Sequence, residues 1–300
     1  MKKSVSLLLA ALMLTGALAG CGSSASTSAG AQDSSASDTG VSGAVTVISR
    51  EDGSGTRGAF VELTGVEEKN ADGQKVDNTT ADAEIANKTD VVLTSVAGNE
   101  KAIGYISLGA LNDTVKAVKV DGAEATVDNV KNGSYKLSRP FNIATKGEPT
   151  GVAKDFINFI LSKDGQAVVT DNKYIAVDDA AEAFVSDGSS GQIAVGGSSS
   201  VSPVMEKLIE AYKNVNPNAA IDLQTSDSTS GMTGAMDGTF DIGMASRELK
   251  DEEAAQLTGT VIALDGIAVI VNPANAIDEL SMDQIKSIYV GDITDWGDLA

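Results

Sequence analysis

Strand-like and helix-like segments alternate from Ala44 to the end of the chain, and this alternation restricts the possible fold more than any other feature. Apolar runs such as "AVTVIS" (44–49) and "DGIAVIVNP" (265–273) have the composition of buried strands. The segment "GVAKDFINFILSKDGQAVV" (151–169) has apolar residues at helical spacing instead. Alternation of this kind predicts an α/β fold built on mainly parallel sheets.

The rest of the body continues this pattern on both sides of a polar segment at 185–191, "VSDGSSG", which we expect to be a hinge-like linker. Ser281 is expected to cap the last helix. The other expected strands lie within 102–111, 115–122, 138–147, 191–197, 220–226 and 240–246, and the other expected helices within 54–63, 202–217, 231–238 and 281–292.

The first 21 residues, "MKKSVSLLLAALMLTGALAGC", are typical of a secretory signal peptide, and their apolar run is too short to span a membrane. Cys21 is the only cysteine, so no intramolecular disulfide can form. It is either incidental to a cleaved signal or the acylated first residue of a lipoprotein. The run "LAGC" resembles a bacterial lipobox and favours the lipoprotein. We therefore expect a signal peptide at 1–20, lipidation of Cys21 and a flexible Ser/Ala/Gly tether at 21–43.

The chain carries a formal net charge of −20 and contains no histidine. Loss of Lys2 and Lys3 with the signal peptide would lower the charge to −22. No basic face for nucleic acid is visible, and the acidic body should avoid anionic lipid surfaces beyond its anchor. Ser-His-Asp catalysis, Cys-His catalysis and most zinc sites are excluded because they need histidine. No cofactor and no metal are expected.

Three turns share one arrangement, in which glycines and small hydroxyl residues lie between the end of a strand and the start of a helix. They are "SREDGSGTRGAF" (49–60), "GGSSSVSPVMEKL" (196–208) and "TSDSTSGMTGAM" (225–236). Glycine allows a ligand close to the backbone, and free N–H groups at a helix start favour an anion. Any one turn alone is read most simply as a helix cap. Three of them, one beside an arginine, predict an anion site.

Arg50 and Asp52 lie in the first of these turns. Arg50 can fork onto two oxygens of a tetrahedral oxyanion, or it can form an ordinary surface pair with an aspartate. A carboxylate repels an anion unless the anion carries a proton, and near neutral pH phosphate carries one whereas sulfate does not. Asp52 is therefore predicted to accept a hydrogen bond from phosphate and to select against sulfate.

At these residues the chain resembles the phosphate-binding protein of bacterial phosphate ABC importers. The resemblance lies in "SREDGSGTRGAF", "GSSSVSPVMEKL", "DIGMASREL", "DGIAVIVNP" and "ITDWGDL", and it covers nearly all of 44–300. It implies a two-lobed α/β periplasmic-binding-protein fold of the type II kind, with the ligand in the cleft between the lobes. The phosphate ligands that the resemblance implies are Arg50, Asp52, Ser54, Gly55, Thr56, Ser199, Ser200 and Ser228, with Thr229 as a neighbour. Arg247 either contacts phosphate or only closes the cleft, because some family members have an aspartate there.

The motifs stand in an unusual order, since in the family the "GSSSVSP" loop usually precedes the "REDGSGT" loop. In family order, "DITDWGDLA" (292–300) would run directly into "VTVISREDGSGT", so the body looks circularly permuted. We expect an intact permuted monomer rather than a truncated tandem or a strand-exchanged pair, because each expected segment occurs once. One lobe, with the "REDGSGT" loop, would comprise 44–114 and 268–300, and the other, with "GSSSVSP" and "SDSTSGM", would comprise 115–267.

The resemblance implies extracytoplasmic capture of inorganic phosphate by a protein that is lipid-anchored to the cell membrane, and delivery to the permease subunits of an ABC importer. A binding protein for sulfate, molybdate or another oxyanion is one alternative, and a phosphate sensor is another. An enzyme is not expected. A hydrolase with Ser54 or Ser199 as nucleophile would lack a histidine base, and neither G-x-S-x-G nor G-x-x-x-x-G-K-[ST] surrounds these serines.

Overall fold

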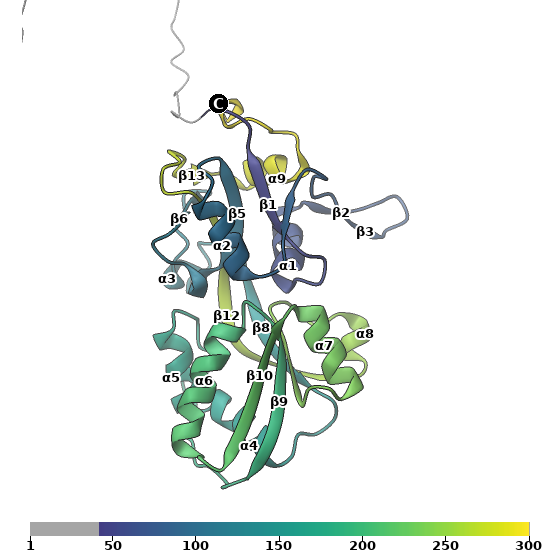
Figure 1. Cartoon of the computed structure of the whole chain (residues 1–300), viewed down its shortest axis with the longest axis vertical. Coiled ribbons are helices and arrows are strands. Elements are labelled where there is room, and N and C mark those ends of the chain that lie inside the picture. Colours follow the sequence, from purple (N-terminus) through teal and green to yellow (C-terminus); the bar gives the residue numbers. More distant parts are fainter. Residues whose placement is uncertain (1–41, 300) are drawn as a thin grey trace, which may run out of the picture. The chain divides into compact units, whose positions relative to one another are not determined.

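The computed structural model describes residues 42–299, and two hydrophobic cores occupy this part of the chain, one in each of two lobes (Figure 1). The predicted signal peptide, the lipidation of Cys21 and all but the end of the predicted tether lie outside the described residues. No helix within 42–299 is long and apolar enough to cross a membrane.

The first lobe is built from both ends of the described chain. Its core contains Val47 and Phe60 from the beginning and Ile288 and Trp296 from the end. All six residues of its central strand, β5, are buried, as expected for a strand covered on both faces. Its elements are β1 (Thr46–Arg50), α1 (Gly55–Thr64), β2 (Glu67–Lys69), β3 (Lys75–Asp77), β4 (Glu84–Ala86), α2 (Thr89–Ala97), β5 (Ala102–Ser107), η1 (Leu108–Ala110), β6 (Lys116–Ala117), β7 (Lys119–Val120), α3 (Val127–Lys131), β13 (Glu279–Leu280), α9 (Met282–Val290) and η2 (Trp296–Asp298).

The second lobe lies between these two parts of the sequence. Its core packs α4 and α6 against the sheet, with Phe156 and Leu208 fully buried. A small third cluster around Met232 lies under α7. The elements of this lobe and of the crossing are β8 (Ser138–Thr145), α4 (Gly151–Leu161), α5 (Lys163–Asp171), β9 (Gly191–Ser198), α6 (Ser202–Val215), β10 (Ala219–Ser226), α7 (Ser228–Asp237), β11 (Ile242–Ala245), α8 (Asp251–Ala254) and β12 (Thr258–Val271).

Strand β12 joins the sheets of the two lobes (Figure 1). It pairs with β8 as far as Gly266 and with β5 from Ile267 onward, and both pairings are antiparallel. The strand order is therefore continuous, β10-β9-β11-β8-β12-β5-β1-β4. The predicted α/β class is confirmed, but the sheets are mixed rather than mainly parallel. The chain crosses between the lobes twice in opposite directions, so the two crossing strands cannot be parallel.

The lobe boundary differs from the one that the sequence predicts. Val115, Tyr135 and Leu137 belong to the first core, so the segment 115–137 lies in the first lobe rather than the second. The segment 185–191 is not a linker between lobes either, because it joins α5 to β9 within the second lobe. Ser186 Oγ donates to Asp155 of α4 at 2.7 Å, which ties this segment to its own lobe. The chain first crosses at β8.

Some predictions for single helices and strands are confirmed and others are wrong. Ser281 caps α9 as expected, with its hydroxyl accepting from the Gln284 N–H. The predicted helix at 151–169 is two helices, because Ser162 leaves helical geometry and caps α5. The strand expected at 115–122 is two short strands, β6 and β7, which pair with different partners. The sequence reading gave no elements for 66–101, where the structure has the β2–β3 hairpin, β4 and α2.

The two ends of the described chain meet in the first lobe. The Val45 N–H donates to the Thr294 carbonyl at 2.8 Å, and the Trp296 N–H donates to the Gly43 carbonyl at 3.1 Å. Leu299 is buried in the same core against which Val45 packs. The sequence reading placed both residues in one lobe, and the structure agrees.

Candidate functional site

Arg50, the last residue of β1, has a side chain that is only 2% exposed. Its N–H donates to the Tyr105 hydroxyl at 3.1 Å, and that hydroxyl lies 2.9 Å from Ser49 Oγ. Burial raises the pKa of Tyr105 to about 12, so it remains a neutral support for this strand end. The guanidinium donates to both carboxylate oxygens of Glu51 at 2.8 Å, and Nη2 also donates to Ser199 Oγ at 3.2 Å. Arg50 therefore reaches from the first lobe to the second.

Helix α1 begins a few residues after Arg50, at a place where the two lobes approach closely. Ser54 is its N-cap, and the Ser54 hydroxyl accepts from the Arg57 N–H at 3.3 Å. A Cβ added to Gly55 would come within 2.4 Å of Ser228 Oγ in the second lobe, so a side chain here would force Ser228 or its neighbours to shift. Thr229 of the second lobe also contacts the first lobe here, because its N–H donates to the Gly53 carbonyl at 3.1 Å.

Buried hydroxyl groups from both lobes lie together at this helix start, and we call them the hydroxyl cluster. Thr56 Oγ1 lies 2.8 Å from Ser200 Oγ. In the second lobe, the Ser246 N–H donates to Ser228 Oγ at 3.1 Å. Hydroxyls both donate and accept hydrogen bonds, which suits an oxyanion in more than one protonation state. The members are Thr56 and Thr89 of the first lobe and Ser199, Ser200, Ser228 and Ser246 of the second, each at most 7% exposed.

Asp52 lies outside this cluster, which corrects the prediction that it faces the ligand. Its side chain is 98% exposed and pairs with Arg57 Nη1 at 2.9 Å. β1 ends at Arg50 and the chain turns at Asp52, so the alternation of the strand does not extend to Asp52: Arg50 points inward while Asp52 points to solvent. The carboxylate that contacts Arg50 is Glu51, which the sequence reading did not select.

Arg247 is directed away from the hydroxyl cluster. Its Nη1 and Nη2 donate to the two carboxylate oxygens of Glu253 at 2.7 and 2.8 Å, and Nη2 lies 3.4 Å from Thr229 Oγ1. Burial by itself would raise the pKa of Glu253, but hydrogen bonds from Arg247 and from the Lys250 N–H bring it below its ordinary value. The side chain passes beside α1, because its Cγ would lie 3.0 Å from a Cβ on Gly55. In this arrangement Arg247 packs across the cleft rather than into the cluster.

A third arginine, Arg139 of β8, lies at the crossing between the lobes. Its Nη2 donates to Asp265 Oδ2 at 3.0 Å, and Ser107 Oγ of the first lobe donates to Asp265 Oδ1 at 2.9 Å. Arg139 and Asp265 are directly opposite each other on β8 and β12, two residues before the first β12 residue that pairs with β5. Burial lowers the pKa of Arg139, and the nearby positive charge of Arg50 lowers it further.

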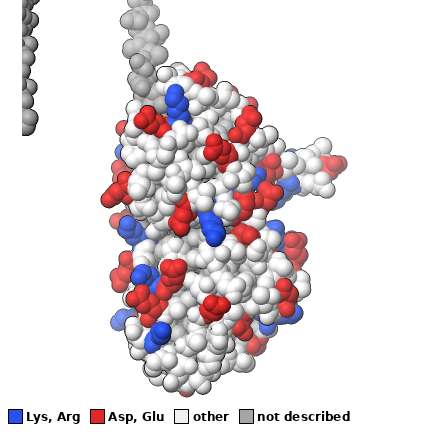
Figure 2. Space-filling view, in the orientation of Figure 1, with Lys and Arg blue, Asp and Glu red and all other residues white. Residues whose placement is uncertain are grey.

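Each of these three arginines therefore has a carboxylate partner: Glu51 for Arg50, Asp265 for Arg139 and Glu253 for Arg247. The fixed positive charge around the cleft is largely neutralised. On the outer surface, basic and acidic side chains are interspersed over the face that Figure 2 shows. An anion in the cleft would thus be held mainly by hydroxyl and N–H dipoles.

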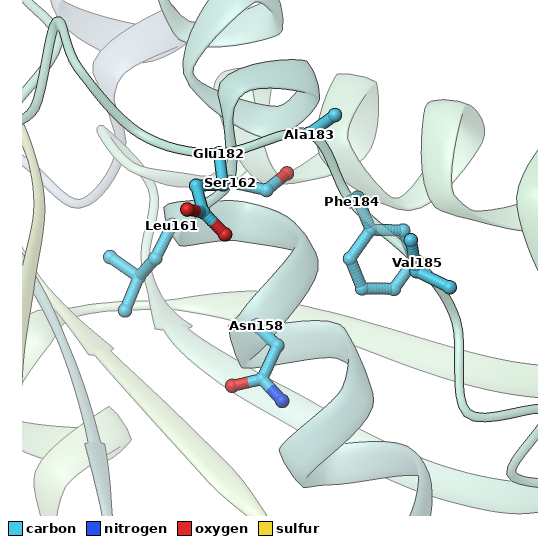
Figure 3. Close-up of a pocket in the computed structure, with 7 residues that line it drawn as sticks. All are labelled: Asn158, Leu161, Ser162, Glu182, Ala183, Phe184 and Val185. Carbon is cyan, nitrogen blue, oxygen red and sulfur yellow. The ribbon is translucent and has the colours of Figure 1, made fainter.

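One surface pocket of the second lobe fits an anion less well than the hydroxyl cluster does. A pocket of about 440 Å³ in the second lobe is lined by Asn158 of α4, by Ser162 after this helix, and by the segment 182–185 with Glu182 and Phe184 (Figure 3). It is open to solvent, contains no basic side chain, and includes none of the predicted ligands. Within residues 42–299, no group of three or more Cys, Asp or Glu side chains is arranged to hold a metal ion.

The structure brings together most of the residues predicted for the site. Arg50, Gly55 and Thr56 meet Ser199, Ser200 and Ser228, and Ser54 lies behind them as the helix cap. Asp52 and Arg247 are not brought to this point. The residues that the sequence reading missed are Glu51, Thr89 and Ser246. Ser246 directly follows the strand in the quoted "DIGMASREL" and could have been selected, whereas Thr89 follows no glycine-rich turn and gives no such signal.

Comparison with known proteins gives full-length matches. A sequence profile of the PBP superfamily domain matches residues 26–164 and 183–300. Phosphate-binding protein PstS 2 of Streptococcus agalactiae is 52% identical over 301 residues, covering 99% of this chain and 98% of that protein. Phosphate-binding protein PstS 2 of Streptococcus pneumoniae is 48% identical over 297 residues, covering 99% of each. The crystal structure of a phosphate-binding protein of a phosphate ABC transporter from Streptococcus pneumoniae TIGR4 superposes with a TM-score of 0.69 at 49% identity, over 86% of this chain and 100% of that one.

Proposed function

Because this chain belongs to the PBP superfamily, and within it to the family of phosphate-binding proteins, we propose that it binds inorganic phosphate between its two lobes. The observation that carries the proposal is the convergence of Arg50 with buried hydroxyls from both lobes. A tetrahedral oxyanion presents oxygens in four directions, so it is held best by donors that approach from opposite sides. The hydroxyl cluster supplies donors from both sides.

The affinity would come from local dipoles rather than from excess positive charge. Arg50 keeps Glu51 as a partner, and a chain of net charge −20 does not attract an anion from a distance. When the two lobes meet, the hydroxyl groups and the N–H groups at the start of α1 are shielded from water. Their hydrogen bonds to an anion are then stronger than at an exposed surface. Glu51 would act as a positioning residue that holds the guanidinium of Arg50 in plane.

Selection of phosphate over sulfate would need an acceptor that has no proton of its own, because a hydroxyl can turn its proton toward a sulfate oxygen. Asp52 is too exposed for this role. The six buried hydroxyls can donate to either anion, whereas a carboxylate that faces a sulfate oxygen would have no proton to accept. Glu51 is the carboxylate close to Arg50 and would take this role.

Capture and release would follow from bending at β8 and β12, the two strands that connect the lobes. We further propose that the protein is lipid-anchored through Cys21 outside the cytoplasmic membrane, acts as a monomer, and passes phosphate to the permease of an ABC importer. The adjacent chain ends in the first lobe support a circularly permuted arrangement, since termini that meet can be joined and reopened elsewhere. It would function as a carrier and not as an enzyme.

Calorimetry tests this function on protein that has been stripped of bound phosphate. Phosphate should bind with one site per chain, and sulfate at the same pH and ionic strength should bind more weakly. Incubation with phosphate esters should give no turnover. If phosphate fails to bind while sulfate or molybdate does, the protein is a carrier for another oxyanion. Release of phosphate from an ester would identify an enzyme instead.

A further inference from the structure

Thr89 belongs to the hydroxyl cluster although neither its position in the sequence nor its neighbours predict a site. It is the first residue of α2, follows β4 after a two-residue turn, and is 4% exposed. Its Oγ1 lies 3.4 Å from Ser199 Oγ and 3.4 Å from Ser200 Oγ. Both serines are in the second lobe. A side chain of the first lobe is thus buried against hydroxyls of the second.

The hydroxyl of Thr89 does not donate to a carbonyl of its own helix, as hydroxyls of helical threonines often do. Thr64 and Thr94 each donate to the carbonyl four residues earlier in their own helix. Thr89 is the first residue of its helix and has no such carbonyl within it. Among the described residues, the partners recorded for its Oγ1 are Ser199 and Ser200.

The contacts of Thr89 are long enough to be exchanged for better ones. A separation of 3.4 Å exceeds the usual 2.7–2.8 Å between hydroxyl oxygens, whereas Thr56 makes a contact of 2.8 Å with the same Ser200. Ser200 therefore lies between a tightly bonded threonine and a loosely bonded one. A ligand oxygen can take the loose hydroxyl with little loss of existing hydrogen bonding.

We propose that Thr89 is a further phosphate ligand, and that the β4–α2 turn is a further segment of the site beside the three glycine-rich turns and Ser246. The inference rests on the proposed phosphate binding. Thr89 donates to a phosphate oxygen when the ligand is P–O⁻ and accepts when it is P–OH. It also links the ligand to Ser199 and Ser200, so its hydroxyl stabilises the closed form.

The test compares Thr89→Val, which keeps the shape and removes the hydroxyl, with Thr94→Val one turn later on the same helix. Thr94 is exposed and donates only within α2, so its variant controls for a valine in this helix. Calorimetry should show phosphate binding weakened roughly ten- to hundredfold in Thr89→Val, as expected for one hydrogen bond to a charged group. Thr94→Val should bind as wild type does, and Thr89→Ser should recover most of the loss.

The outcomes separate this inference from the function on which it rests. Wild-type protein that binds no phosphate would overturn the function. If wild type binds phosphate and Thr89→Val binds it with the same dissociation constant, only the role of Thr89 is overturned. A loss in Thr89→Val that Thr89→Ser does not recover would also overturn it, since the effect would then come from packing. If circular dichroism shows that Thr89→Val is unfolded, the phosphate dissociation constant of Thr89→Ala is compared with that of wild type instead.

Discussion

Two buried polar regions of this protein are held together in different ways. The hydroxyl cluster joins the lobes through neutral groups, with contacts such as 2.8 Å between Thr56 and Ser200 and 3.4 Å between Thr89 and Ser199. The crossing strands are joined by the ion pair of Arg139 and Asp265, whose side chains are 2% and 0% exposed. Both regions connect the lobes, but only the first contains groups that can change partners.

The difference follows from what each group would lose on separation. A hydroxyl that leaves another hydroxyl can bond to a ligand or to water at little net cost. An ion that leaves its partner in a dry interior remains as an uncompensated charge. Burial raises the pKa of Asp265 to about 6 in spite of Arg139, and it lowers the pKa of Arg139. The crossing is therefore suited to a permanent link and the cluster to a reversible one.

Loss of one partner at the crossing should have the largest effect on stability. Asp265→Ala should lower the free energy of unfolding by about 3–5 kcal/mol, because Arg139 would be left buried and unpaired. Urea denaturation measures the change. The matched control is Asp278→Ala, which removes an 81% exposed partner of Lys116 and should change stability little. Equal effects in the two variants would show that the crossing pair resembles a surface pair.

Loss of the charge at the cluster should weaken binding. Arg50→Ala should weaken phosphate binding by about 2–4 kcal/mol, because Glu51 would lose its partner and the ligand its one guanidinium contact. Lys207→Ala, at an exposed pair with Glu210, is the control for removal of one positive charge. Unchanged calorimetric binding in Arg50→Ala would remove this residue from the site.

The crossing pair should also make stability depend on pH in a direction opposite to that of ordinary acid denaturation. The pKa of Asp265 is about 6 in the folded protein against 3.8 for an unperturbed aspartate, so between these values the folded state holds a proton that the unfolded state has lost. The free energy of unfolding should therefore fall as pH rises from about 4 to about 6, by roughly 1–3 kcal/mol.

Asp265→Asn provides the comparison, because it retains the shape and cannot titrate. The difference between the wild-type and variant pH profiles isolates this residue from other acids such as Glu253, whose pKa is lowered and whose contribution has the opposite sign. Parallel profiles over this range would mean that Asp265 does not titrate there.

The smallest effect is expected at Asp52. Asp52→Asn changes an exposed side chain that pairs only with Arg57 on the surface, so phosphate affinity and the preference over sulfate should stay within about twofold of wild type. Competition binding of the two anions at one pH measures the preference. A large gain in sulfate binding would show that Asp52 does accept the proton of phosphate in the wild type. It would also mean that the turn rearranges when the ligand binds.

Much of the site could be predicted because its signals are local. A strand end, a glycine and a helix cap lie within a few residues of one another, and all three such turns converge at the cluster. The lobe boundary could not be read in this way. Nothing near residue 115 marks a crossing, and only packing shows that 115–137 remains with the first core until β8 begins.

By itself the sequence determined the α/β class, the three turns and the prediction of Arg50 as the arginine of the site, since each depends on residues close together in the chain. Only the tertiary structure decided which of three consecutive charged residues faces inward: Arg50 is buried, Glu51 is its partner and Asp52 is exposed. It also brought Thr89 to Ser199, across 110 positions of sequence. The physical reason is that orientation and contact are set by how the strands pack and how the two lobes close, and neither leaves a pattern in neighbouring residues.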